Sequence, residues 1–158
     1  NAFYGNPDAD GNGVADRKWE DANLTGVAPP WQMVLAWAPA TKLRTIRIHK
    51  KCAESLSAIL EEIWALHGRD QRAIETRRLH LYGGAYMFRP MRGSSRLSIH
   101  SWGAAIDLDP ERNALGVKYN EAAGMMPMPT VRIFERHGWV WGGRWSRPDA
   151  MHFQAASV

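Results

Sequence analysis

The sequence lacks the features that define several protein classes. It contains a single cysteine, Cys52, which excludes an intrachain disulfide and a cysteine-rich zinc site. No apolar run approaches the ~20 residues needed to cross a bilayer, and residues 1–4 do not show the basic and apolar blocks of a secretory leader. We therefore expect no transmembrane segment and see no export route. Any bound metal must be held by histidine and carboxylate side chains.

The excess of positive over negative charge is also small. The formal net charge is +4 over 158 residues, and the basic side chains are scattered. The densest clusters, residues 49–51 and 77–78, are not interleaved with the aromatic side chains of a nucleic-acid groove, so we expect no nucleic-acid partner. Hydrophobic residues make up 45% of the chain, and this length suits one domain with a sizeable core. We predict a single domain over residues 1–158 and a monomer.

Apolar spacing predicts a mixture of helices and strands. Leu56, Ile59, Leu60 and Ile63 follow the i, i+3, i+4, i+7 pattern of an amphipathic helix over residues 51–66. The other predicted elements are a strand at 45–49, a strand or hairpin around Gly83-Gly84, a short helix after Pro129, and strands at 139–141 and 152–155 around a Gly-Gly turn. Because β and α segments do not alternate regularly, the fold class is α+β.

The first thirty residues read as irregular. Within them, Asp8, Asp10, Asn12 and Asp16 place oxygen side chains as the start of a calcium loop does. The twelfth position of such a loop should be acidic, but here it is Trp19. Glycine beside Asp and Asn is equally typical of turns. We favour a turn-rich surface loop over a calcium site.

The stretch from residue 98 to 109 carries the first candidate site. Residues 104–109 alternate as a strand, with Asp107 and Asp109 on one face. His100 lies just upstream in a segment that can fold back over this strand. A neutral imidazole and a carboxylate that converge in this way suit zinc. Asp109 is the rival ligand, but it lies about 6.6 Å beyond Asp107 along a strand, so one ion is not expected to bind both.

A second candidate segment lies near the C-terminus. Asp149 and His152 are three residues apart and follow Trp-Gly-Gly-x-Trp at 141–145. On a turn leading into a strand, both side chains can reach one ion, one as a ligand and the other through a water molecule. Three protein ligands and an open position are typical of a catalytic zinc site.

Together, these segments resemble a known enzyme family. The pattern Ser98-x-His100-x-x-Gly103-x-Ala105-x-Asp107, followed by Trp-Gly-Gly-x-Trp and Asp-x-x-His, is similar to zinc peptidases of the D-alanyl-D-alanine carboxypeptidase and L-alanyl-D-glutamate endopeptidase family, which includes VanY-like enzymes and phage endolysins. The match covers about residues 79–154, the expected zinc-site core. The resemblance implies a DD-peptidase or hedgehog-like fold, a small antiparallel sheet with helices packed mainly on one side.

The resemblance also implies roles for individual residues. His100, Asp107 and His152 would ligate Zn²⁺, and Asp149 would be the catalytic base. An upstream arginine would hold a substrate carboxylate; Arg89 and Arg92 are the candidates, and Arg89 is preferred. Ser98 could hydrogen-bond in the site, although a loop serine is more often a local turn former. Gln154 stands where an acidic residue is expected.

The function implied is hydrolysis of a stem-peptide amide bond in peptidoglycan, at the bacterial cell wall. Within that class, we favour an endolysin-type L-alanyl-D-glutamate endopeptidase over a D-alanyl-D-alanine carboxypeptidase. The alternative from another class is a non-catalytic cell-wall-binding module on the same fold. The remaining histidines are assigned no metal: His49, His67, His80 and His137.

Overall fold

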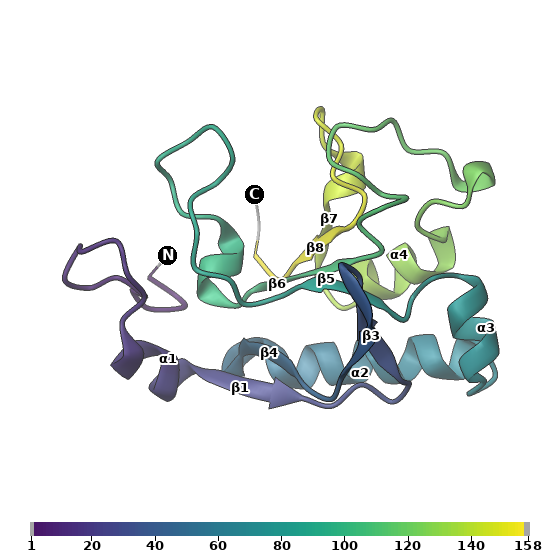
Figure 1. Cartoon of the computed structure of the whole chain (residues 1–158), viewed down its shortest axis with the longest axis horizontal. Helices are drawn as coiled ribbons and strands as arrows, with labels where there is room; N and C mark the ends of the chain where they lie inside the picture. The colour runs from purple at the N-terminus through teal and green to yellow at the C-terminus, as the bar shows by residue number, and fades with distance from the viewer. Residues whose placement is uncertain (1, 157–158) are drawn as a thin grey trace.

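The computed structural model describes residues 2–156 (Figure 1). The α-helices are α1 (Arg17–Asn23), α2 (Lys50–Leu66), α3 (Gln71–Thr76) and α4 (Met128–Arg136). The strands are β1 (Leu24–Val27), β2 (Met33–Leu35), β3 (Ala38–Leu43), β4 (Ile46–His49), β5 (Leu81–Gly84), β6 (Ala105–Leu108), β7 (Val140–Trp141) and β8 (His152–Gln154). Short 3-10 helices are η1 (Ile99–Trp102), η2 (Glu121–Ala123) and η3 (Gly142–Arg144). The predicted α+β class is confirmed.

The central sheet has six strands in the order β3-β2-β5-β6-β8-β7. Neighbouring strands run antiparallel except for β2 and β5, which are parallel. The prediction of an antiparallel sheet is therefore wrong at this one pair. Strands β1 and β4 form a separate two-stranded antiparallel sheet. The more specific hedgehog-like fold stays a prediction.

The hydrophobic core lies between the central sheet and helices α2 and α4. The apolar face of α2 is buried, as its 3.6-residue spacing predicts. Ile106 and Leu108 of β6 and Phe153 of β8 are fully buried in the same core. Figure 1 shows α2 below the sheet and the loops of residues 86–98 and 110–127 rising above it. The side chains of β6 and β8 that point away from the core thus face the loops.

One local prediction differs from the structure, and another is narrowed by it. The segment predicted as irregular, residues 1–30, contains α1 and β1 at residues 17–27, because the Asp16 carboxylate caps α1 and β1 pairs with β4. Of the strand or hairpin predicted around Gly83-Gly84, the structure contains the strand, β5, which lies between β2 and β6. A Cβ at Gly83 would lie 3.1 Å from the Asp107 Cβ, so this residue lets β5 approach β6 closely.

The acidic loop of residues 8–16 uses its oxygens on its own backbone. Asp8 accepts from the N–H groups of Asn12 and Gly13, at 3.0 and 3.1 Å. Asp16 accepts from the N–H of Lys18 at 2.9 Å. These bonds are those of a turn followed by a helix cap. They agree with the preferred interpretation as a turn-rich surface loop.

Candidate metal centre

Strands β6 and β8 place Asp107 and His152 side by side. The two residues are direct partners in the antiparallel ladder, and partners across a ladder point to the same face of a sheet. Their neighbours Ile106 and Phe153 point to the opposite face, into the core. The alternation of β6 therefore fixes the direction of the Asp107 carboxylate, as the sequence predicted.

His100 reaches the same face from η1. The Ser98 hydroxyl oxygen caps this short helix by accepting from the His100 N–H at 3.3 Å. Gly103 ends it with a left-handed backbone, φ +67°, where a Cβ would lie 2.9 Å from the His49 nitrogen. Only glycine fits this turn without a shift. The Ser-x-His-x-x-Gly spacing thus encodes the turn that returns His100 over β6.

The three side chains converge within one small volume. His100 Nε2 lies 3.3 Å from Asp107 Oδ2, and His152 Nδ1 lies 3.0 Å from Asp107 Oδ1. The ligand atoms of these three residues all lie within 4.8 Å of one another. The imidazoles are 4% and 5% exposed, and the Asp107 side chain is 13% exposed. These three ligands come from three elements, η1, β6 and β8, and their ligand atoms already lie close enough to share one ion.

Charge pairing dominates the electrostatics of the cluster. Burial opposes the charged form of Asp107, but in the metal-free protein hydrogen bonding with His100 and His152 and the positive charge of these imidazoles outweigh it and hold the pKa of the carboxyl well below its usual range. Burial likewise opposes the charged form of His152, and Asp107 overcomes this and raises the pKa of the imidazole. The carboxylate is therefore ionised, and positive charge on the imidazoles or on a bound metal ion balances it.

The donor set fits zinc. The Ala85 carbonyl can only accept, so His100 donates to it from Nδ1, at 2.6 Å. The Nε2 of a neutral His100 then presents a lone pair toward the Asp107 carboxylate, an arrangement that requires a proton or a metal ion between the two acceptors. Two ligand atoms bound tetrahedrally to one zinc ion lie about 3.3 Å apart. His100 Nε2 lies at this spacing, 3.3 Å, from Asp107 Oδ2, and His152 Nδ1 lies 3.0 Å from the other carboxylate oxygen, Oδ1.

Asp149 lies at the edge of this cluster, on the turn before β8. Its backbone N–H donates to the Gly142 carbonyl at 2.8 Å, and a Cβ at Gly142 would lie 2.5 Å from the backbone carbonyl oxygen of Asp149. The Trp-Gly-Gly motif therefore holds this turn. The Asp149 Oδ1 atom is buried and has no hydrogen-bond partner within residues 2–156. An unpaired buried acceptor is costly, which suits a group that takes up a proton.

The environment of Asp149 shifts its titration. Burial raises the pKa of the Asp149 carboxyl above its ordinary value, and repulsion from Asp107 adds to this effect. The charges of His152, His100 and Arg89 act in the opposite direction. A carboxyl whose pKa is raised toward neutrality is a better proton acceptor and donor than an ordinary aspartate.

The three predicted substrate-binding residues occupy different environments. Arg89 is half-buried, and its charge acts on Asp149, whereas Arg92 is exposed in the turn of the 90–97 loop. The substrate role of each arginine stays a prediction. Ser98 is the turn former described above. Sequence reasoning missed Ser101, whose hydroxyl donates to the Arg89 carbonyl at 2.9 Å and accepts from its N–H at 3.0 Å. This buried serine ties Arg89 to the His100 turn.

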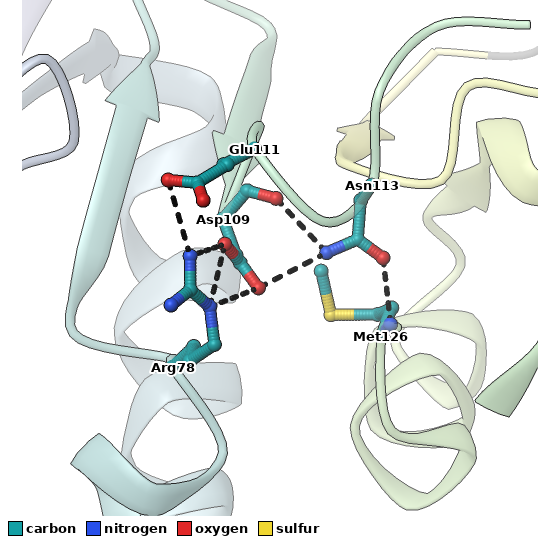
Figure 2. Close-up of polar contacts among 5 residues, drawn as sticks. All are labelled: Arg78, Asp109, Glu111, Asn113 and Met126. Carbon is teal, nitrogen blue, oxygen red and sulfur yellow. Dashed lines mark hydrogen bonds and ion pairs between the residues drawn. The ribbon is translucent and has the colours of Figure 1, made fainter. Parts of the chain in front are cut away.

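The rival ligand Asp109 is not part of the cluster. Strand β6 ends at Leu108, and Asp109 adopts φ +47°, so the predicted alternation stops one residue early. Figure 2 shows its carboxylate bound by Arg78, whose Nε and Nη2 lie 2.9–3.1 Å from its oxygens. Asn113 donates to the Asp109 carbonyl at 2.9 Å and accepts from the Met126 N–H at 2.6 Å. This network anchors the 110–127 loop.

Comparison with known proteins supports the family resemblance. Residues 92–155 match a protein-family model described as D-alanyl-D-alanine carboxypeptidase. This segment contains His100, Asp107, Asp149 and His152. The match bears out the predicted family resemblance over these residues, and it supports a peptidase whose three converging ligand groups would hold zinc. No curated protein and no solved structure was found to match the chain.

Proposed function

We propose, from the premise that residues 92–155 match the D-alanyl-D-alanine carboxypeptidase family, that this single-domain chain is a zinc-dependent peptidase of bacterial peptidoglycan. The observation that carries the proposal is the convergence of three ligand atoms within 4.8 Å, together with the buried, unpaired oxygen of Asp149, whose pKa responds to the charges of these three residues. His100, Asp107 and His152 would hold the ion. A non-catalytic binding module would have no need of the buried, unpaired carboxyl oxygen.

The proposed chemistry uses few residues. When bound, zinc supplies Lewis-acid activation of water and of the scissile carbonyl. Asp149 Oδ1 accepts a proton from the water that attacks the carbonyl carbon. The new C–O bond replaces the C–N bond, and Asp149 returns the proton to the leaving amine. The guanidinium of Arg89 binds a substrate carboxylate, for which its planar fork is better suited than an ammonium group.

The scissile bond is the finer part of the proposal. In both the L-alanyl-D-glutamate and the D-alanyl-D-alanine bonds of a stem peptide, the residue on the amine side carries an α-carboxylate, so an arginine clamp suits either. The resemblance to endolysin peptidases favours the endopeptidase, which would act at the cell wall. The description of the matched family favours the carboxypeptidase, the second candidate.

Product analysis separates the two activities. Purified peptidoglycan is incubated with the zinc-loaded protein, and the products are identified by mass spectrometry. We expect stem peptides released from L-alanine, with a new D-glutamate amino terminus. Free D-alanine as the sole product would instead establish the carboxypeptidase. No cleavage by the wild type, together with folded protein and bound zinc, would overturn the peptidase proposal.

A further inference from the structure

The acceptor behind His152 is the side chain of Gln154. Residues i and i+2 of a strand share a face, so β8 presents both side chains toward the metal centre. His152 Nε2 lies 2.9 Å from Gln154 Oε1. The Gln154 amide nitrogen donates to the Ala156 carbonyl at 2.8 Å. Gln154 is 7% exposed, so water does not readily replace either bond.

These contacts determine the proton position on His152. The Ala156 carbonyl can only accept, which places the amide nitrogen of Gln154 against it and the amide oxygen against His152. That oxygen can only accept as well, so His152 donates from Nε2. The Nδ1 atom, which faces Asp107 at 3.0 Å, is then the nitrogen available to a metal ion.

The two imidazoles are supported differently. His100 donates to a backbone carbonyl, that of Ala85, which no substitution removes. His152 depends on a side chain. Hydrogen-bond acceptors behind ligating histidines fix the ring orientation and the tautomer, and their loss typically weakens metal affinity by about 10–100-fold.

We propose that Gln154 is a positioning residue, which fixes the Nε2–H tautomer and the orientation of His152 and thereby sets the zinc affinity of the centre. The inference rests on the proposed metal site. It assigns a role to the position at which the sequence departs from the expected acidic residue. A neutral amide fulfils the acceptor role without adding another negative charge to a centre that already contains Asp107 and Asp149.

Two substitutions separate the acceptor role from the bond to Ala156. Gln154→Met keeps similar length but removes both polar groups. Gln154→Glu keeps the acceptor for His152 and loses the donor to Ala156. For each purified protein, the dissociation constant for Zn²⁺ is measured by competition with a chromophoric chelator, and the unfolding temperature is measured without metal. The temperature reports any purely structural role of the side chain.

We expect Gln154→Met to weaken zinc binding by about 10–100-fold and Gln154→Glu to bind zinc at least as tightly as the wild type. If the methionine variant does not fold, Gln154→Asn, whose shorter side chain withdraws the acceptor, takes its place with the same expectation. Wild-type affinity in the acceptor-deficient variant, or equal weakening in the glutamate variant, would overturn the inference alone. A wild type that binds no zinc would overturn the proposed metal centre as well.

Discussion

Asp107, in β6, and Asp109, just after it, are two residues apart, yet their carboxylates have different kinds of partner. The Asp107 carboxylate faces two imidazole nitrogens, His100 Nε2 and His152 Nδ1. The Asp109 carboxylate is bound by both nitrogens of the Arg78 fork and by Asn113 (Figure 2). Both are buried, with side chains 13% and 3% exposed.

The difference lies in what the partners can do. A guanidinium is a permanent cation with donors only, so the Arg78–Asp109 pair is complete and leaves no place for a metal. An imidazole can exchange its proton for a metal ion, so the Asp107 carboxylate and its two imidazoles can serve as a ligand set. Burial and charge therefore do not by themselves distinguish a metal site from a structural ion pair; the type of partner does.

Replacing the first aspartate should have the largest effect. Asp107→Asn removes a charged ligand, so we expect zinc affinity to fall by at least about 100-fold, more than the loss of a group behind a ligand causes. Peptidoglycan hydrolysis should fall with it. Isothermal titration with Zn²⁺ measures the affinity, and circular dichroism confirms the fold. Zinc affinity within a few-fold of the wild type would show that Asp107 is not a ligand.

Replacing the proton acceptor should separate binding from chemistry. Asp149→Asn keeps the size of the side chain but cannot accept the proton, and general acid–base groups contribute about 10²–10⁴-fold to rate. We expect a loss of hydrolysis in that range, measured by product release from peptidoglycan, with zinc affinity nearly unchanged. Near-normal hydrolysis by the zinc-loaded variant would mean that another group is the base.

Replacing the second aspartate, Asp109, should lower stability and leave zinc affinity unchanged. Asp109→Asn tolerates the left-handed backbone but leaves the Arg78 charge without its buried partner. Such a break costs about 3–5 kcal/mol for a fully buried pair; Arg78 is 22% exposed, so we expect about 2–4 kcal/mol. Urea unfolding of the metal-free protein measures this.

The matched control for that variant is Glu111→Gln. Glu111 also contacts Arg78, at 3.7 Å, but its side chain is 86% exposed, so its removal should change stability little. Zinc affinity should stay at the wild-type level in both variants. A large loss of zinc binding in Asp109→Asn would end the distinction between the two aspartates.

The smallest expected effect is a pH-dependent stabilisation. Because burial raises the pKa of Asp149 in the folded state, folding favours the protonated carboxyl, and stability falls as pH rises from the unfolded pKa, about 3.9, through the folded value. The Asp149→Asn variant has no carboxyl to ionise, so it does not lose stability in this way. Its metal-free unfolding temperature should equal that of the wild type at low pH and exceed it at neutral pH, by about 2–4 °C per kcal/mol recovered.

Thermal scans with a chelator, at a series of pH values, test this last prediction. A difference between variant and wild type that does not change with pH would mean that ionisation of Asp149 does not cost stability.

Features that depend on local sequence patterns could be predicted from the sequence. The 3.6-residue spacing predicted α2 to within one residue of its observed start. The motif resemblance proposed His100, Asp107 and His152 as one trio, and the structure brings these three side chains together. The parallel pairing of β2 with β5 was missed because it joins segments far apart in the chain. The same holds for Arg78, which meets Asp109 across 31 positions.

Finer roles depended on side-chain geometry. The Ser98 hydroxyl caps η1, as the turn-former alternative predicted, and its substrate role stays a prediction. Ser101, next to the motif histidine, holds Arg89. Both are buried serines in one short turn, and composition cannot tell them apart. Gln154 stands where an acidic residue was expected, and the structure shows that its amide oxygen can accept the hydrogen bond that a carboxylate would accept.

The most direct test of the metal centre is an anomalous difference map at the zinc absorption edge, from crystals of the protein grown with Zn²⁺. We predict a peak about 2.0–2.2 Å from His100 Nε2, an Asp107 carboxylate oxygen and His152 Nδ1. A zinc peak elsewhere, with these three atoms free of metal, would contradict the account.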